Sequence, residues 1–131
     1  MRMDAKDCKP NIEIKNLEVK RGGVTILNVP SLLIHAGEIL ALIGPNGAGK
    51  TTFLQALSYL LKPFQGEIFF RGKKVEANHS VLEYRRKLAM VFQEPLLFDT
   101  TVFKNVASGL KIRGMKKKEI DDRVIEQLGR F

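Results

Sequence analysis

The sequence contains one glycine-rich run, Gly44-Pro45-Asn46-Gly47-Ala48-Gly49-Lys50-Thr51, which follows the pattern G-x-x-x-x-G-K-[ST]. Glycines let the backbone wrap tightly enough for several N–H groups to point at one anion. A helix that begins near Lys50 would add its own unpaired N–H groups and the positive end of its dipole. The run therefore predicts a loop that binds the phosphates of a nucleotide.

The side chains at the end of this run have separate predicted roles. Lys50 brings a full charge to the β- and γ-phosphates, and the Thr51 hydroxyl is placed to ligate Mg²⁺. Thr52 offers a further hydroxyl to a phosphate. The alternative interpretation is a glycine-rich turn between a strand and a helix, with an ordinary surface lysine.

A strand should lead into this loop and a helix should leave it. Residues 39–43 form a short apolar run with β-branched ends, as expected for a strand that is buried on both faces. The helix after the loop is predicted to end near Pro63. Five apolar residues share one face of it: Phe53, Leu54, Leu57, Leu60 and Leu61.

Two antiparallel hairpins are predicted, one on each side of the loop. Residues 12–19 alternate in polarity, with a slip near Asn16 that indicates a bulge, and Gly22-Gly23 turns the chain into a strand over residues 24–29. Pro30 interrupts that strand, and residues 31–34 continue in an extended form. The second hairpin joins residues 66–70 to 73–75.

The second half of the chain predicts helices and one more strand. Ser80 and Glu83 form a capping box that opens a short helix through Lys87, and residues 88–92 predict an apolar strand. Thr100 or Thr101 caps a helix that ends at Gly114. The apolar faces of this helix and of a last one are Val102, Phe103, Val106 and Leu110, and Ile120, Val124, Ile125 and Leu128.

Composition bounds the class of protein. The chain has 131 residues, is 44% hydrophobic and carries a formal net charge of +8, so it can bury one core. Its basic residues are scattered without interleaved aromatic residues, so we expect solvated faces and no nucleic-acid partner. Cys8 is the only cysteine, which excludes an internal disulfide and fits a reducing compartment. With no spanning or signal segment visible, we expect a soluble protein that reaches a membrane through a partner.

The order of these motifs resembles that of the ATP-binding subunits of ABC transporters. An antiparallel pair is followed by GPNGAGKTT (residues 44–52), a hairpin, VFQEP (91–95) and TVFKNVASGLKIRG (101–114). The match runs from about residue 11 to residue 131. It implies an α/β fold: an incomplete P-loop NTPase core, an antiparallel β subdomain, and the start of a helical subdomain at about residues 99–131. Residues 1–10 are expected to form a flexible tail.

The resemblance also implies site roles, cofactors and partners. Gln93 matches the Q-loop glutamine, which contacts Mg²⁺ and the attacking water and would act in catalysis with Lys50. From its own sequence context, Gln93 is a polar residue at the end of a strand. ATP and Mg²⁺ are the implied cofactors. A second ATP-binding subunit and a transmembrane permease subunit, at the cytoplasmic face of the membrane, are the implied partners. The sequence of residues 95–114 is most similar to that of importers of tungstate or molybdate.

Two departures from the family pattern stand out. Arg21 precedes Gly22 where family members carry an aromatic residue that stacks on adenine. A guanidinium plane can also stack on a base, and the alternative is a solvated arginine in a turn. The second departure is the absence of a signature motif, of an apolar run ending in Asp-Glu after the loop, and of a later switch histidine. We therefore expect a domain truncated before the signature and Walker B motifs, and an isolated chain that is inactive.

Three hypotheses for function follow. The first is the ATPase subunit of an importer, represented by its N-terminal half. The second is a fragment that binds nucleotide without turnover. The third is another P-loop enzyme, such as a small-molecule kinase. It is disfavoured because antiparallel strands precede the loop and no arginine-rich lid follows it.

Overall fold

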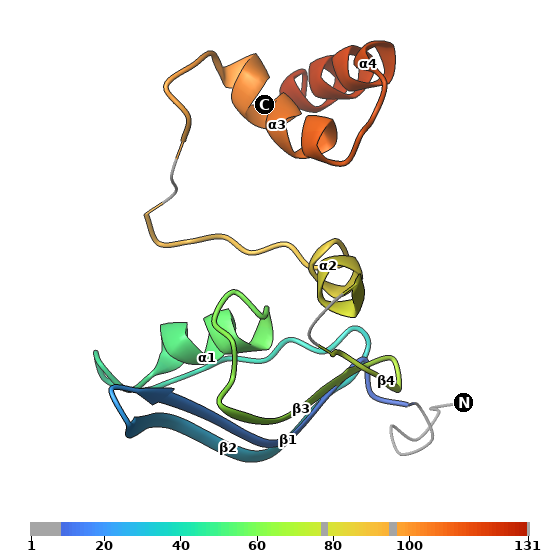
Figure 1. Ribbon diagram of the computed structural model, residues 1–131. Coiled ribbons are helices and arrows are strands. Elements are labelled where there is room, and N and C mark those ends of the chain that lie inside the picture. The colour runs from blue at the N-terminus through green and yellow to red at the C-terminus, as the bar shows by residue number, and fades with distance from the viewer. Residues whose placement is uncertain (1–8, 77–78, 95–96, 131) are drawn as a thin grey trace. The chain divides into compact units, whose positions relative to one another are not determined.

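The computed structural model describes residues 9–76, 79–94 and 97–130, in two compact units that divide between Met90 and Val91. Within these ranges, the first unit holds a sheet with two helices and the second unit holds a pair of helices (Figure 1). The predicted tail over residues 1–10 lies almost entirely outside the described residues.

The first unit is built on a four-stranded antiparallel sheet. Its strands are β1 (Ile12–Arg21), β2 (Val24–Ile34), β3 (Gln65–Phe70) and β4 (Lys73–Lys74), in the order β2-β1-β3-β4. Both predicted hairpins are confirmed. Their turns have positive φ at two successive residues, as type I′ turns require: Gly22 (56°) and Gly23 (80°), then Arg71 (51°) and Gly72 (76°).

Pro30 does not interrupt the second strand, so that part of the prediction is wrong. β2 continues through Pro30 as far as Ile34. The strand lies at an edge of the described sheet, where a residue without an N–H is tolerated.

The predicted bulge at Asn16 is confirmed. Asn16 has φ 48°, and the register between β1 and β3 shifts between Lys15 and Glu18. Because side chains alternate along a strand, this extra residue returns Leu17 to the face that already holds Ile14. Both side chains are fully buried. The bulge therefore keeps the apolar side of β1 on a single face.

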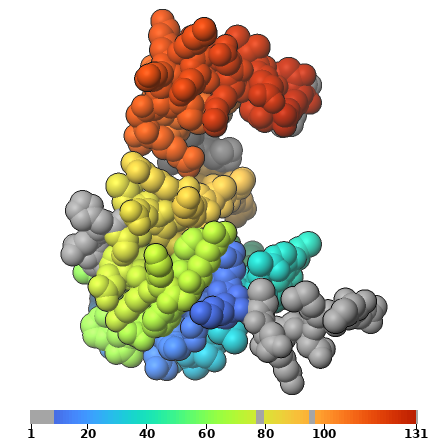
Figure 2. Space-filling model, turned by 90° about the vertical axis from the view of Figure 1, so that its right-hand side faces the viewer, coloured from blue at the N-terminus to red at the C-terminus, as the bar shows by residue number. Residues whose placement is uncertain are grey.

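One face of the sheet packs against α1 (Lys50–Leu57) and α2 (His79–Arg85). Figure 2 shows the β3–β4 hairpin, in green, beside α2, in yellow. The core joins Ile68 of β3 to Phe53 and Ala56 of α1 and to Tyr84 of α2. Each buried aliphatic or aromatic side chain contributes about 1.5–3 kcal/mol relative to an exposed one.

The helix α1 is shorter than the sequence pattern predicts. It ends at Leu57, because the Ser58 hydroxyl donates to the Leu54 carbonyl (2.9 Å) and Tyr59 takes φ 56°. Leu54 and Leu60, which were expected on the buried face, are exposed.

The predicted capping box at Ser80 is also wrong in its position. α2 already begins at His79, so Ser80 lies inside its first turn. The Ser80 hydroxyl instead accepts from the Glu76 N–H (2.7 Å) and donates to the Glu76 carbonyl (2.6 Å). It thereby ties the start of α2 to the end of the β3–β4 hairpin.

Two apolar segments that were predicted as strands, residues 39–43 and 88–92, are not strands. Ile39 and Ile43 are 97% and 95% exposed, and Val91 is 92% exposed. Neither segment pairs with any strand among the described residues. An extended segment becomes a strand only when a neighbour takes its backbone hydrogen bonds. An apolar sequence alone therefore does not make residues 39–43 or 88–92 form a strand.

The second unit consists of α3 (Val102–Ile112) and α4 (Lys117–Leu128). Thr101 is the N-cap of α3, and its side chain accepts from the Lys104 N–H (3.3 Å). At the other end Gly114 has φ 76°, its N–H donates to Lys111 (2.9 Å), and the Met115 N–H donates to Leu110 (3.1 Å). This is a Schellman motif, so the prediction that the helix stops at Gly114 is confirmed.

The contact between α3 and α4 uses part of each predicted apolar face. Ala107, Ile120 and Val124 are buried, and Phe103, Leu110 and Leu128 pack around them. Val102, Val106 and Ile125 were expected on these faces but are exposed. The apolar surface that α3 and α4 bury against each other is therefore narrower than the apolar faces predicted from the sequence.

We predict that Gly66 is the glycine of the sheet least tolerant of a side chain. It has φ 100°, and a Cβ there would lie against the Asn16 carbonyl oxygen and 2.5 Å from Leu17 Cα. Both obstacles are backbone atoms, so Gly66→Ala should lower the free energy of unfolding by about 3 kcal/mol or more. Urea unfolding followed by circular dichroism measures this loss of stability.

Gly72→Ala is the matched control, because Gly72 also has positive φ but has no atom within 4 Å of the added Cβ. It should cost only about 1–2 kcal/mol. Equal losses would contradict the assigned contact.

Candidate nucleotide-binding loop

The glycine-rich run forms a loop against the edge of the sheet. After β2 the chain returns along the sheet to the end where the β1–β2 hairpin turns, and there it enters α1 (Figure 1). Gly49 is the N-cap of α1, with φ 86°. A Cβ on Gly49 would lie 3.7 Å from both the Ile26 carbonyl oxygen and Leu27 Cδ1, so the loop packs directly on β2.

The loop closes on itself through backbone contacts. The Ala48 N–H donates to the Pro45 carbonyl (3.2 Å), and Gly47 takes φ 82°. A Cβ on Gly44 would lie only 3.2 Å from Ala48 Cβ, which is tighter than an ordinary contact. Glycine at these positions therefore permits a loop that a bulkier chain could not form.

Lys50 places its charge at the centre of this loop. Its Nζ donates to the carbonyl oxygens of Gly44 and Pro45, each at 2.7 Å. The side chain thus folds back over the loop although Lys50 itself belongs to α1. The loop around it, from Gly44 to Ala48, is exposed, so an anion can reach the ammonium group.

The first turn of α1 adds backbone donors to the same place. Gly49 has no side chain with which to cap the helix, so the first-turn N–H groups are available to a ligand. Thr51 is exposed and Thr52 is half-buried in that turn. Glycine amides, helix N–H groups, an ammonium and two hydroxyls suit a polyphosphate with its bound Mg²⁺. The Thr51 hydroxyl is an oxygen donor of the kind that Mg²⁺ accepts. The described residues hold no cluster of three or more His, Cys, Asp or Glu side chains that could hold a metal ion.

The two remaining predicted site residues lie in different units. Arg21 ends β1 and pairs with Val24, at the same hairpin end on which Gly49 packs through Ile26, and it is exposed. Gln93 belongs to the second unit and is exposed. The structure therefore gathers residues 44–52 into one loop with Arg21 at the adjoining hairpin, and the role of Gln93 stays a prediction. The support that Ile26 and Leu27 give the loop was missed, because a backbone contact leaves no residue pattern.

Comparison with known proteins decides the family. A family model described as ABC transporter matches residues 27–131.

The chain belongs to the ABC transporter family.

Relatives in this family include ATP-binding proteins of two uptake systems. The tungstate uptake system ATP-binding protein TupC of Peptoclostridium acidaminophilum is 41% identical over 115 residues, which cover 88% of this chain and 51% of the relative. The phosphate import ATP-binding protein PstB of Thermotoga maritima is 37% identical over 125 residues, covering 91% of this chain and 50% of the relative. The chain spans about half the length of the curated relatives it matches.

Solved ABC transporter structures share the fold. CbiO1 from Clostridium perfringens, part of the ABC transporter complex cbiONQ, superimposes with a TM-score of 0.76 at 29% identity, covering 93% of this chain and 50% of that one. A bacterial Atm1-family ABC exporter with ATP bound gives a TM-score of 0.67 at 30% identity, covering 77% of this chain and 18% of that one. The predicted family and the predicted α/β fold with its antiparallel sheet are both confirmed. Among the described helices, none is long and apolar enough to span a membrane.

Proposed function

We propose that this chain supplies the ATP-binding loop of an ABC transporter ATP-binding subunit. The observation that carries the proposal is the closed loop with Lys50 Nζ at its centre, 2.7 Å from two loop carbonyls. An ammonium group beside a glycine-rich loop and a helix N-terminus suits the negative charge of a triphosphate.

Each residue of the loop has a distinct task in this proposal. Lys50 turns its charge toward the β- and γ-phosphates, and Thr51 ligates the Mg²⁺ that ATP brings. Thr52 and the backbone N–H groups of Gly44 and residues 46–52 donate to phosphate oxygens, and Pro45, which has no N–H, shapes the loop. Arg21 stacks on or lies against adenine at the β1–β2 turn. Gln93 contacts Mg²⁺ and orients the attacking water.

The transport role extends the same proposal. The relatives named above take up tungstate and phosphate, which are both tetrahedral oxyanions. We propose that the transporter imports an oxyanion of this kind, with tungstate or molybdate as first choice and phosphate as its rival. A second ATP-binding subunit would complete the ATP site, and a permease subunit would hold the protein at the cytoplasmic face of the membrane.

A second candidate function is nucleotide binding without turnover. A polypeptide of these 131 residues alone would fit it, because they contain no signature motif and no Asp-Glu after an apolar run. In-line attack on the γ-phosphate needs a positioned water and charge stabilisation as well as a bound nucleotide. A polypeptide of these residues would have the binding elements and lack a general base.

ATP affinity should depend on Lys50. Lys50→Ala removes a charge-assisted contact of roughly 1.5–3 kcal/mol, so ATP–Mg²⁺ should bind about ten- to a hundredfold more weakly. Isothermal titration calorimetry measures both forms. Lys62→Ala, which removes an exposed lysine beyond α1, is the matched control and should leave the affinity unchanged. Equal affinities for the wild type and Lys50→Ala would refute the proposed site.

Arg21 should limit adenine recognition. Arg21→Tyr replaces the guanidinium by the aromatic ring usual at this position, and ATP should then bind several-fold more tightly, because base stacking on an aromatic ring is worth about 1–3 kcal/mol. Inorganic triphosphate has no base, so its affinity should change little. If both ligands respond alike in parallel titrations, Arg21 acts through its charge.

The 131-residue chain should bind ATP without measurable turnover. Steady-state phosphate release from monodisperse protein should equal that of Lys50→Ala, which serves as the blank. Turnover of about 1 s⁻¹ or more, a usual enzyme rate, that disappears in Lys50→Ala would show that these residues hydrolyse ATP unaided.

A further inference from the structure

The end of α1 opposite the loop is held by partners for each of its last four carbonyl groups. The last four carbonyl oxygens of a helix have no N–H donor within the helix, so their donors must come from outside it. Leu54 accepts from the Ser58 N–H (3.0 Å), Gln55 from the Leu61 N–H (3.0 Å), and Ala56 from the Tyr59 N–H (3.0 Å). All three donors follow α1 directly in the chain.

The fourth carbonyl, that of Leu57, has its partner on another element. Tyr84 of α2 donates its hydroxyl to the Leu57 oxygen at 2.8 Å. Tyr84 is 3% exposed, and its ring meets that of Phe70 edge to face, with centroids 5.4 Å apart. Burial raises the pKa of Tyr84, so the hydroxyl keeps its proton and remains a donor across the physiological range.

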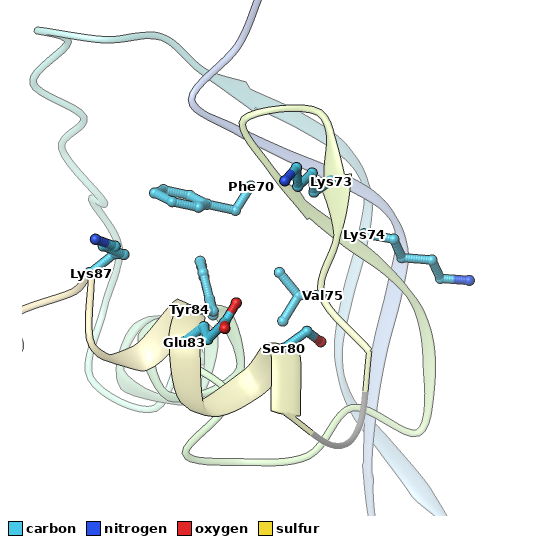
Figure 3. Close-up of a pocket in the computed structure, with 8 residues that line it drawn as sticks. All are labelled: Phe70, Lys73, Lys74, Val75, Ser80, Glu83, Tyr84 and Lys87. Atoms are coloured by element: carbon cyan, nitrogen blue, oxygen red, sulfur yellow. The ribbon is translucent and has the colours of Figure 1, made fainter.

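Figure 3 shows Tyr84 rising from α2 toward Phe70, in the wall of a pocket of about 200 Å³ between α2 and the β3–β4 hairpin. Glu83 lines the same pocket one residue earlier. Tyr84 therefore links three elements: it packs on β3, belongs to α2, and bonds the backbone of α1.

Separate contacts hold the chain that follows α1, without using a carbonyl group of α1 itself. Tyr59 has φ 56°, an uncommon conformation for a bulky residue that persists only where surroundings enforce it. Its hydroxyl donates to the Val75 carbonyl (3.0 Å), and Arg85 of α2 donates to its carbonyl oxygen. The chain just beyond α1 is thus fixed to Val75, which follows β4, and to α2.

The contact of Tyr84 with Leu57 can influence the loop at the other end of α1, because α1 is short. Its eight residues span about 12 Å, with Lys50 at the first and Leu57 at the last. Two-turn helices are marginal in isolation and depend on tertiary contacts. A change at Leu57 therefore reaches the first turn, where Lys50 and Thr51 lie.

We propose that Tyr84 is a positioning residue for the nucleotide-binding loop. By donating a hydrogen bond to the Leu57 carbonyl, it holds α1 in the orientation that presents Lys50 and Thr51. This inference rests on the proposed function. It assigns to α2, which contributes nothing to the loop itself, a part in nucleotide affinity.

The test compares two tyrosines that each lose only a hydroxyl. Tyr84→Phe keeps the ring and its contact with Phe70, and should weaken ATP–Mg²⁺ binding by about three- to tenfold. Tyr59→Phe removes a hydrogen bond to Val75 in the same unit, which does not involve a carbonyl of α1, and should change the affinity by less than about twofold. Glu83→Gln alters the pocket beside Tyr84 without touching α1 and should also leave the affinity unchanged. Titrations are corrected for the folded fraction, which urea unfolding gives for each variant.

Amide hydrogen exchange provides a readout that does not involve ATP. In Tyr84→Phe the α1 amides should exchange faster by about the same factor, with the strand amides of β1 unchanged, whereas Tyr59→Phe should leave α1 exchange near the wild type. Wild-type ATP binding with unaltered affinity in Tyr84→Phe would overturn the inference, and so would equal losses in the two phenylalanine variants. Failure of the wild type to bind ATP would instead refute the proposed function, and exchange alone would then report on Tyr84.

Discussion

The strand β1 exchanges backbone hydrogen bonds with β2 on one side and with β3 on the other. Every other element of the first unit is placed by this pairing. The bulge at Asn16 keeps the apolar side of β1 on one face, and Gly66 of β3 lets the neighbouring backbone pass close to it. Because that face is continuous, α1 and α2 can both bury side chains on it, with Ile14 and Ile68 completely enclosed beneath them.

The proposed nucleotide-binding loop is positioned by the same sheet. Glycines stand at its start and end, Gly44 and Gly49, so the loop has few side chains with which to pack and depends on contacts of its backbone. Gly49 packs on β2, and Phe53 anchors α1 in the core one turn later. Lys50 donates to two carbonyl groups of its own loop, so the chain itself holds the charge beside the loop.

Local chemistry explains which parts could be predicted from sequence. The Gly22-Gly23 turn, the Thr101 cap and the Gly114 stop each depend on residues within a few positions of one another, and each prediction was correct. Residues 39–43 and 88–92 were predicted wrongly, because strand formation depends on a partner that their own sequence cannot specify. The early end of α1 depends on the Ser58 hydroxyl, which donates to the Leu54 carbonyl, and on Tyr59, whose hydroxyl donates to the distant Val75 carbonyl. The exposure of Val106 depends on how α4 packs on α3. For the site, the motif located the loop, while the supports at Leu27 and Tyr84 required the fold.

The division of the chain into two units separates two parts of the proposed chemistry. Lys50, Thr51 and Arg21 belong to the first unit, together with the sheet and the junction at Tyr84. Affinity for a nucleotide can therefore be set by one cooperatively packed body. Gln93 belongs to the second unit, whose own core of Ala107, Ile120 and Val124 is complete without the sheet. The proposed role of Gln93 therefore depends on a part of the chain that packs around its own core, whereas the proposed roles of Lys50, Thr51 and Arg21 depend on the sheet and on the packing around α1.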